Sequence, residues 1–516
     1  MVEQITYKNI DPRVRNMIMA GLVFAMLCAC FDGTIVGTCG TIIAQDLEGL
    51  DMYAWMTTAY MLCETVMIPI SGKLSDLYGR KPLFLIGLAI FVGGSIVAGL
   101  STSMEMFIAC RAVQGIGGGI LIPVATAAVA DLYAPHERAR MQGLLGAVFG
   151  IGSGIGPLLG GFITDNISWH WVFYINVPFA LIAFFLTIRK FPSPIQDTKP
   201  IIDYSGIAVL TLLLLDLVLF FHWAGDEFEW LSAQSAGMVA VAVIAILVFW
   251  RLEKRAKEPV ISPYVLHNKT VIMAAVFMFL FGLAMMGAMM YSSMFAIYIL
   301  GLTTMEAAEY TIAMIVGMMI TALASGATVQ KTGYKPWLIA GPIISFIGLY
   351  MMSKLTLDSE LSYYAVCLFV FGFGLGCMMA IVMTAVQNSS TPRDIGMTTS
   401  AVNVIRSIGS TIGTAVFALI INNKIAMELK DNVDGWVYDM VPHTTGVLNY
   451  LQSPEFIIAV GEANVHGILL SFANSVNMAF LIGGGLILIL TVIGFFFKET
   501  PPAPLKKSES ETPSEE

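Results

Sequence analysis

The sequence predicts an all-α polytopic membrane protein. Of its 516 residues, 57% are hydrophobic and only 12% are charged, whereas soluble domains carry about 25% charged residues. Apolar runs of about 20 residues recur along the whole chain, and each can cross ~30 Å of hydrocarbon as a helix. We count about fourteen such runs, which begin near residues 17, 53, 83, 105, 138, 171, 205, 231, 270, 306, 336, 362, 394 and 471.

Lysines and arginines cluster in alternate loops between these runs, as at Arg13, Lys73 and Arg138. Because cytoplasmic loops carry the excess of basic residues, this distribution sets the orientation. The first run contains Asp32 and is longer than the apolar region of a signal peptide, so we expect a retained helix. The sequence therefore predicts a multi-pass protein of the plasma (inner) membrane, in contact with the lipid bilayer, with both termini in the cytoplasm.

Ionisable residues inside the apolar runs are the first signal of function. Asp32, Glu64 and Asp216 are acidic, and Arg111 and Arg406 are basic. A charge in hydrocarbon costs roughly 2.5–3.5 kcal/mol on insertion scales, so it is usually paired, protonated or placed in a polar cavity. Such residues in a polytopic protein indicate ion-coupled transport. For Asp216, in one of the later runs, we favour a structural role.

The loop predicted after the second run suggests a conformational switch. Gly72 and Gly79 permit a tight turn. Asp76 can cap a helix N-terminus, where free N–H groups and the helix dipole favour an anion. Arg80 can reach Asp131 at the end of the fourth run. Such contacts would hold one conformation and break in another; the alternative is a basic loop that only fixes topology.

The fourth run contains Arg111 and Gly115, which are i,i+4 neighbours on one helix face. The glycine lets another helix approach closely, so we expect Arg111 to face the bundle interior near Asp32. Separating the two charges would change the affinity of Asp32 for a proton. The alternative is a purely structural ion pair.

The fifth run carries closely spaced glycines and a proline: Gly152, Gly156, Pro157, Gly160 and Gly161. Proline kinks a helix, and glycines permit close helix packing. These glycines do not have the spacing of a nucleotide-binding loop after a strand, and the sequence contains no P-loop.

Together these motifs resemble the fourteen-helix drug:proton antiporter branch of the major facilitator superfamily. The glycines and proline of the fifth run match the antiporter motif of that superfamily. Two further segments match this branch, Asp32–Val36 in the first run and Trp169–Pro178 at the entry of the sixth. The resemblance implies two six-helix halves related by pseudo-symmetry, with two extra helices between them and a substrate site near mid-membrane.

On this plan we divide the chain into five parts. They are a cytoplasmic N-terminus at 1–16, an N-terminal six-helix half at 17–190, two extra transmembrane helices at 191–257, a C-terminal six-helix half at 258–498, and a disordered cytoplasmic tail at 499–516. The C-terminal half includes a long external loop at about 424–470. This loop is interpreted as a cap near the lipid interface or as a substrate gate.

Candidate substrate-cavity residues are Tyr60, Glu64, Gln114, Asn176, Asn403 and Arg406, and candidates for proton coupling are Asp32, Arg111 and Glu64. Tyr60 and Glu64 are i,i+4 neighbours and can line one cavity face. Glu64 either attracts a cationic substrate, serves as a second proton site, or is a protonated acid bonded to a neighbouring helix. Asn403 and Arg406 either line the cavity or join helices.

We therefore expect a proton-coupled multidrug efflux antiporter that exports small amphipathic, often cationic compounds. The alternative is a dedicated transporter of one metabolite, such as a siderophore, bile acid or peptide; a non-transporting receptor is a third, weaker interpretation. The sequence shows no arrangement of nucleophile, base and orienting group, and its seven cysteines lack metal-binding spacing. We accordingly expect no enzyme activity, cofactor, metal or nucleic-acid partner, and a monomer.

Overall fold

The computed structural model describes residues 10–49, 52–189, 191, 201–224, 228–261, 268–391, 394–451 and 453–497. Its regular secondary structure within these ranges is helical. Thirteen of the described helices are long and apolar enough to cross a membrane. Helix α2 (Tyr53–Tyr78) has 26 residues and is the fourteenth, but Glu64, Lys73 and Asp76 make it less apolar. The segment before residue 10 and the predicted tail at 499–516 lie outside the described residues.

Seven helices form the N-terminal half, in which α6 and α7 together make the sixth span. Helix α4 packs against α2 and α3, and α1 packs against α5 and α7. The helices are α1 (Pro12–Asp46), α2 (Tyr53–Tyr78), α3 (Arg80–Ala98), α4 (Met104–Leu132), α5 (Pro135–Asn166), α6 (His170–Tyr174) and α7 (Asn176–Thr187).

The C-terminal half is built in the same way. Helix α10 packs against α14, α13 packs against α11 and α12, and α17 covers α12 and α14. The helices are α10 (Lys269–Tyr298), α11 (Thr304–Thr332), α12 (Lys335–Met352), α13 (Leu361–Ser389), α14 (Ile395–Asn432), α15 (Gly435–Met440), α16 (Val447–Tyr450) and α17 (Pro454–Phe496).

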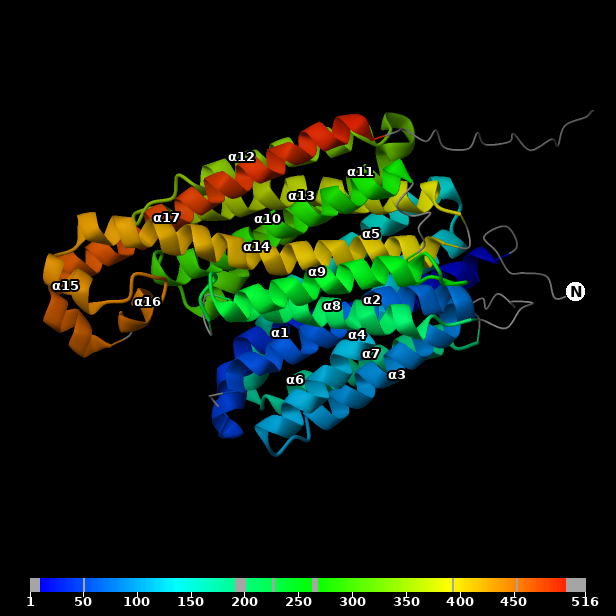
Figure 1. Ribbon diagram of the computed structural model, residues 1–516, viewed down its shortest axis with the longest axis horizontal. Helices are drawn as coiled ribbons and strands as arrows, with labels where there is room; N and C mark the ends of the chain where they lie inside the picture. The colour runs from blue at the N-terminus through cyan, green and yellow to red at the C-terminus, as the bar shows by residue number, and fades with distance from the viewer. Residues whose placement is uncertain are drawn as a thin grey trace, which may run out of the picture.

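The two extra helices are α8 (Tyr204–Trp223) and α9 (Ala233–Glu253). They pack against each other, and α8 also contacts α2 and α14, so the pair spans the junction between the halves (Figure 1). Trp223 meets Trp55 of α2 edge to face, with ring centroids 6.2 Å apart. Near the other end of the pair, Lys73 forms a 2.9 Å ion pair with Glu258.

The halves contact each other mainly through α5 with α11 and through α2 with α14. Helix α1 begins and α17 ends at one end of the bundle, which we call the latch end, and α15 and α16 lie at the opposite cap end (Figure 1). Backbones touch near the latch end because the facing residues are small. A Cβ added to Gly326 of α11 would lie 2.5 Å from the carbonyl oxygen of Ala139 on α5.

The segment expected as an external loop at about 424–470 is largely helical. Helix α14 continues to Asn432 and α17 begins at Pro454, with α15 and α16 between them. The continuation is stable because Ile425 and Leu429 are fully buried. Asn464 also bonds Asp434, donating to its carboxylate at 3.0 Å and accepting from its backbone N–H at 2.8 Å.

Candidate coupling and substrate site

Asp32 of α1 is fully buried inside the N-terminal half and forms an ion pair with Arg111 of α4. Its carboxylate also accepts a hydrogen bond from Gln114 Nε2 at 3.0 Å and one from Asn176 Nδ2 at 3.2 Å. Both amides reach the hydroxyl of Ser95 on α3, at 2.6 Å and 3.3 Å respectively. Because buried charges need pairing and hydrogen bonds, α3, α4 and α7 together stabilise the acid of α1.

Arg111 connects this network to α2. Its guanidinium donates to the carbonyl oxygen of Met56 at 3.3 Å and lies over the ring of Tyr60, 4.4 Å from the ring centroid. A cation over an aromatic face gains about 0.5–2 kcal/mol. The hydroxyl of Tyr60 is buried and has no hydrogen-bond partner among the described residues. The predicted pairing of Asp32 with Arg111 is therefore present, and Tyr60 extends it towards Glu64.

Gln114 and Asn176 are both part of the hydrogen-bond network around Asp32. We expected both in the substrate cavity, but they are 0% and 1% exposed and donate to Asp32 inside the N-terminal half. Sequence reasoning missed Ser95 altogether. Ser95 is a polar residue within the apolar run that forms α3, and this could have drawn attention to it. A single serine in a membrane helix, however, does not identify its partner.

Glu64 lies one helical turn beyond Tyr60, where α2 meets α14 of the other half. It is half-buried, and Arg406 is a basic residue of the facing helix α14. Close by, the hydroxyls of Thr65 and Ser407 form a 3.3 Å hydrogen bond between the two helices. This bond brings Glu64 of one half and Arg406 of the other to the same junction, since each is the neighbour in sequence of a bonded residue.

A small cavity lies between the halves, and Asn403 and Arg406 line it, as one of the two interpretations predicted. Neither Asn403 Nδ2 nor Arg406 Nε has a hydrogen-bond partner among the described residues. The remaining lining residues are Met26, Ile122, Thr126, Gln142, Leu145, Gly146, Phe149, Met379, Ala380 and Met383. Asp216 of α8 is not among the lining residues.

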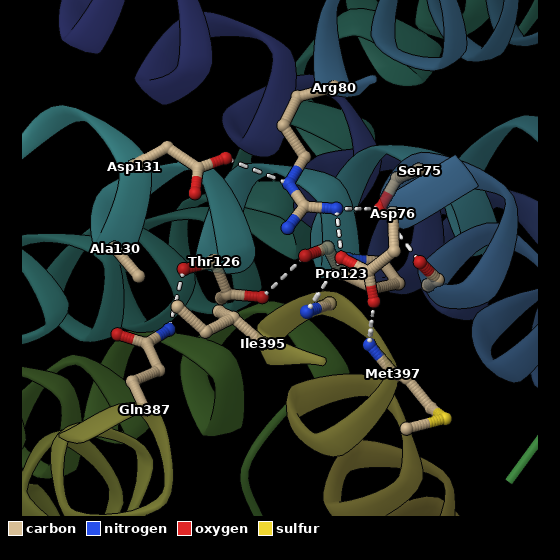
Figure 2. A network of polar contacts seen from close by, with 12 residues as sticks. Ser75, Asp76, Arg80, Pro123, Thr126, Ala130, Asp131, Gln387, Ile395 and Met397 are labelled. Atoms are coloured by element: carbon tan, nitrogen blue, oxygen red, sulfur yellow. Dashed lines mark hydrogen bonds and ion pairs between the residues drawn. The ribbon is translucent and has the colours of Figure 1, made fainter. Parts of the chain in front are cut away.

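Asp76, Arg80 and Asp131 form a cluster that we call the latch (Figure 2). It lies where α2 ends and α3 begins, at the latch end of the bundle. Asp76 accepts hydrogen bonds from the backbone N–H groups of Gly396 at 3.0 Å and Met397 at 2.7 Å, at the start of α14. Arg80 forms ion pairs with Asp76 and, at 2.9 Å, with Asp131. The predicted helix cap is therefore present, and it joins the two halves.

Only one of the two glycines that we expected in the turn near the latch lies there. Gly79 alone makes the turn, with φ at 91°, a conformation that glycine readily adopts. Gly72 lies inside α2 rather than in a loop, and its missing side chain lets Ser400 of α14 approach. Gly72 therefore allows α2 of one half to lie close to α14 of the other. The spacing of residues within one loop gives no sign of such a contact with a distant helix.

Helix α5 uses its antiporter-motif glycines to approach α1. Gly152 faces Cys30, and Gly156 faces Thr34. Gly160 is buried, Pro157 lies within the helix, and a Cβ on Gly161 would meet nothing within 4 Å. The motif therefore supports packing inside the N-terminal half, whereas other glycines of α5, such as Gly143, face α11.

Further contacts between the halves, which sequence reasoning missed, lie near the latch. Arg138 of α5 donates to Asn388 Oδ1 of α13 at 3.0 Å. Gln387 of α13 donates to the carbonyl oxygen of Thr126 on α4 at 2.8 Å (Figure 2). Arg138 had been assigned only to a topogenic basic loop. Together with the latch, these bonds hold the halves together at this end.

This arrangement of two helical halves with buried charges agrees with a family match. The family model described as Major Facilitator Superfamily matches residues 22–414. The chain belongs to this superfamily. Its members carry small-molecule substrates across membranes, so the chain is a multi-pass membrane transporter.

Relatives within the superfamily include two proteins of Bacillus subtilis (strain 168). The "Multidrug transporter protein MdtP" is 36% identical over 81% of this chain and 77% of its own length. "Multidrug resistance protein 3" is 32% identical over 90% of this chain and 92% of its own. Similarity at this level extends through both halves of the chain.

Solved major facilitator structures share the fold. The proton:xylose symporter XylE superposes with a TM-score of 0.62 at 13% identity, covering 95% of this chain and 97% of that one. The human organic anion transporter MFSD10 superposes with a TM-score of 0.61 at 15% identity, covering 94% and 100%. At these identities the likeness concerns the fold alone.

Proposed function

We propose that this transporter is a proton-coupled antiporter that exports amphipathic, often cationic compounds from the cytoplasm. The observation that carries the proposal is the continuous series of groups from Asp32 to the junction of the halves. Asp32 pairs with Arg111, Arg111 lies over Tyr60, and Glu64 follows on the same helix. The names of the two Bacillus relatives support multidrug export.

Asp32 is the proposed coupling acid. Arg111 lies only seven residues from the start of α4 at Met104, roughly 10 Å along the helix, so the pair lies nearer the cap end than the latch end. Protonation neutralises Asp32 and releases Arg111 from the pair, so proton binding alters contacts among α1, α2 and α4.

The latch is proposed to control access from the cytoplasm. The basic residues around it favour a cytoplasmic location for this end and for both termini in the plasma membrane. Asp76 ties the N-terminal half to the first turn of α14, so these bonds must break when this end opens. In the conformation described, the contacts between halves named above hold the latch end together.

A dedicated transporter of one metabolite is the second candidate. One relative, "Citrate exporter 1" of Yarrowia lipolytica, is 30% identical over 89% of this chain and 70% of its own length. Arg406 and Asn403 in the cavity offer hydrogen-bond donors that a carboxylated metabolite would use. A dedicated carrier would transport one such compound and reject unrelated amphipathic cations.

A transport panel on inverted membrane vesicles tests the proposal. Vesicles with an acidic lumen should accumulate ethidium and structurally unrelated lipophilic cations, and adding ethidium should make the lumen more alkaline. Vesicles without the transporter are the control. Uptake that does not depend on the pH gradient would contradict antiport, and uptake of a single carboxylated metabolite would favour the dedicated carrier.

A further inference from the structure

The cavity between the halves combines adaptable apolar surface with unused hydrogen-bond donors. Met26, Phe149, Met379 and Met383 supply the apolar part. Methionine side chains are flexible and polarisable, so they pack around irregular ligands. Aromatic and thioether groups of this kind can accommodate flat or bulky ring systems without fixing one shape.

The donors are Arg406 Nε and Asn403 Nδ2, which lack hydrogen-bond partners among the described residues. Asn403 is 3% exposed and lines the cavity. Leaving a buried donor unsatisfied costs about 1–3 kcal/mol, so both groups have free energy to gain from a ligand. Because an arginine side chain only donates hydrogen bonds, the complementary ligand group must be an acceptor.

Other polar groups around the cavity are already engaged. Gln142 Nε2 donates to the carbonyl oxygen of Thr126 at 2.9 Å, and the Thr126 hydroxyl donates to Pro123 O at 2.9 Å. None of the twelve described lining residues is acidic. The lining therefore favours a ligand acceptor, and most strongly an anionic one.

Arg406 is shared between this cavity and Glu64. Its neighbour Ser407 is hydrogen-bonded to Thr65, the residue after Glu64, so the opposite charges of Arg406 and Glu64 lie near the same junction of the halves and attract each other. A ligand carboxylate that pairs with Arg406 takes over part of that attraction. Glu64 then becomes free to attract a positive group elsewhere on the same ligand.

We propose that the substrates bound best are amphipathic zwitterions, with a carboxylate held by Arg406 and Asn403 and a cationic group facing Glu64. This inference rests on the proposed export function and narrows its substrate class. The carboxylate end lies in the cavity between α5, α13 and α14, and the cationic end lies towards α2. A cation without the carboxylate leaves both donors unsatisfied.

Binding of a matched pair of dyes to the purified full-length protein in detergent tests this. Rhodamine B carries a carboxylate and a delocalised cation, whereas its ethyl ester keeps only the cation. Fluorescence anisotropy gives both dissociation constants without a proton gradient. We expect the wild-type protein to bind rhodamine B about tenfold more tightly, as one charge-assisted hydrogen bond provides.

Variants of the two donors sharpen the test. Arg406→Gln should bring the ratio of the two dissociation constants close to one, and Arg406→Lys should retain a preference for the acid. Asn403→Asp should reverse the preference, because its carboxylate repels that of the dye. Thr411→Val is the matched control on the same helix, since the Thr411 hydroxyl donates to Ser407 O within α14; its ratio should equal that of wild type.

Wild-type protein that binds the two dyes equally, or binds neither, would overturn the proposal. An unchanged ratio in both Arg406→Gln and Asn403→Asp would also overturn it. The vesicle assay reports separately on proton coupling. A preserved dye preference without gradient-driven transport would refute antiport and leave the zwitterion site standing.

Discussion

The Asp76→Asn variant probes how strongly the latch holds the halves together. In the closed structure the Asp76 carboxylate accepts two backbone hydrogen bonds from the start of α14 and pairs with Arg80. A hydrogen bond to a charged acceptor contributes about 1.5–3 kcal/mol, and one to a neutral acceptor about 0.5–1.5 kcal/mol. Asparagine retains one accepting oxygen, so the closed state should lose about 2–4 kcal/mol.

This loss corresponds to a shift of about 30- to 700-fold in the equilibrium between closed and open latch ends. Spin labels at Arg140 of α5 and Lys331 of α11 can report it, because both residues are exposed near this end. Double electron–electron resonance should show a new population at longer distance in Asp76→Asn. The label sites lie outside the latch, so the labels do not disturb its ion pairs.

Asp131→Asn is the matched control. It removes the other acid that pairs with Arg80, but the Asp131 side chain is 38% exposed, whereas that of Asp76 is 5% exposed. Exposed ion pairs contribute about 0.2–1 kcal/mol, equivalent to a shift of up to about fivefold. Unchanged distances in Asp76→Asn, or an equal shift in Asp131→Asn, would refute the latch as described.

Three other substitutions test the rest of the site. Arg111→Ala leaves the buried Asp32 without its cation, at a cost of about 3–5 kcal/mol, and should abolish gradient-driven ethidium uptake; normal uptake between about pH 6 and 8 would show that the ion pair is not needed. Glu64→Gln should reduce transport of a cationic dye more than that of a neutral dye of matched shape, because only the electrostatic attraction is lost; equal losses would favour a structural role. Gly143→Val should keep α5 from approaching Ala322 of α11, which the same spin labels would detect as separation; wild-type distances would contradict this packing.

The span pattern and the central ion pair could be predicted from sequence because each has a local signal. Apolar runs of membrane length identify helices directly. An aspartate and an arginine inside such runs each need a partner, and few partners are available. The Asp32–Arg111 pair could be predicted because few oppositely charged residues lie inside the apolar runs.

The surroundings of a polar or small residue could not be predicted where they depend on which helices lie side by side. Gln114 and Asn176 are polar residues in apolar runs, and such residues can face either a cavity or a buried charge. In the structure both amides bond Ser95 as well as the buried Asp32. This arrangement depends on how α3 and α7 pack around α1. Gly72 was likewise explained by Ser400, which lies in the other half.

Asp32→Asn tests the central claim, that this acid couples proton movement to export. In proteoliposomes the variant should show no ethidium accumulation driven by a pH gradient. It should still exchange ethidium for ethidium without a gradient, because the neutral side chain keeps the shape of the site and the latch is unaltered. Accumulation driven by the pH gradient at the wild-type rate would contradict the account.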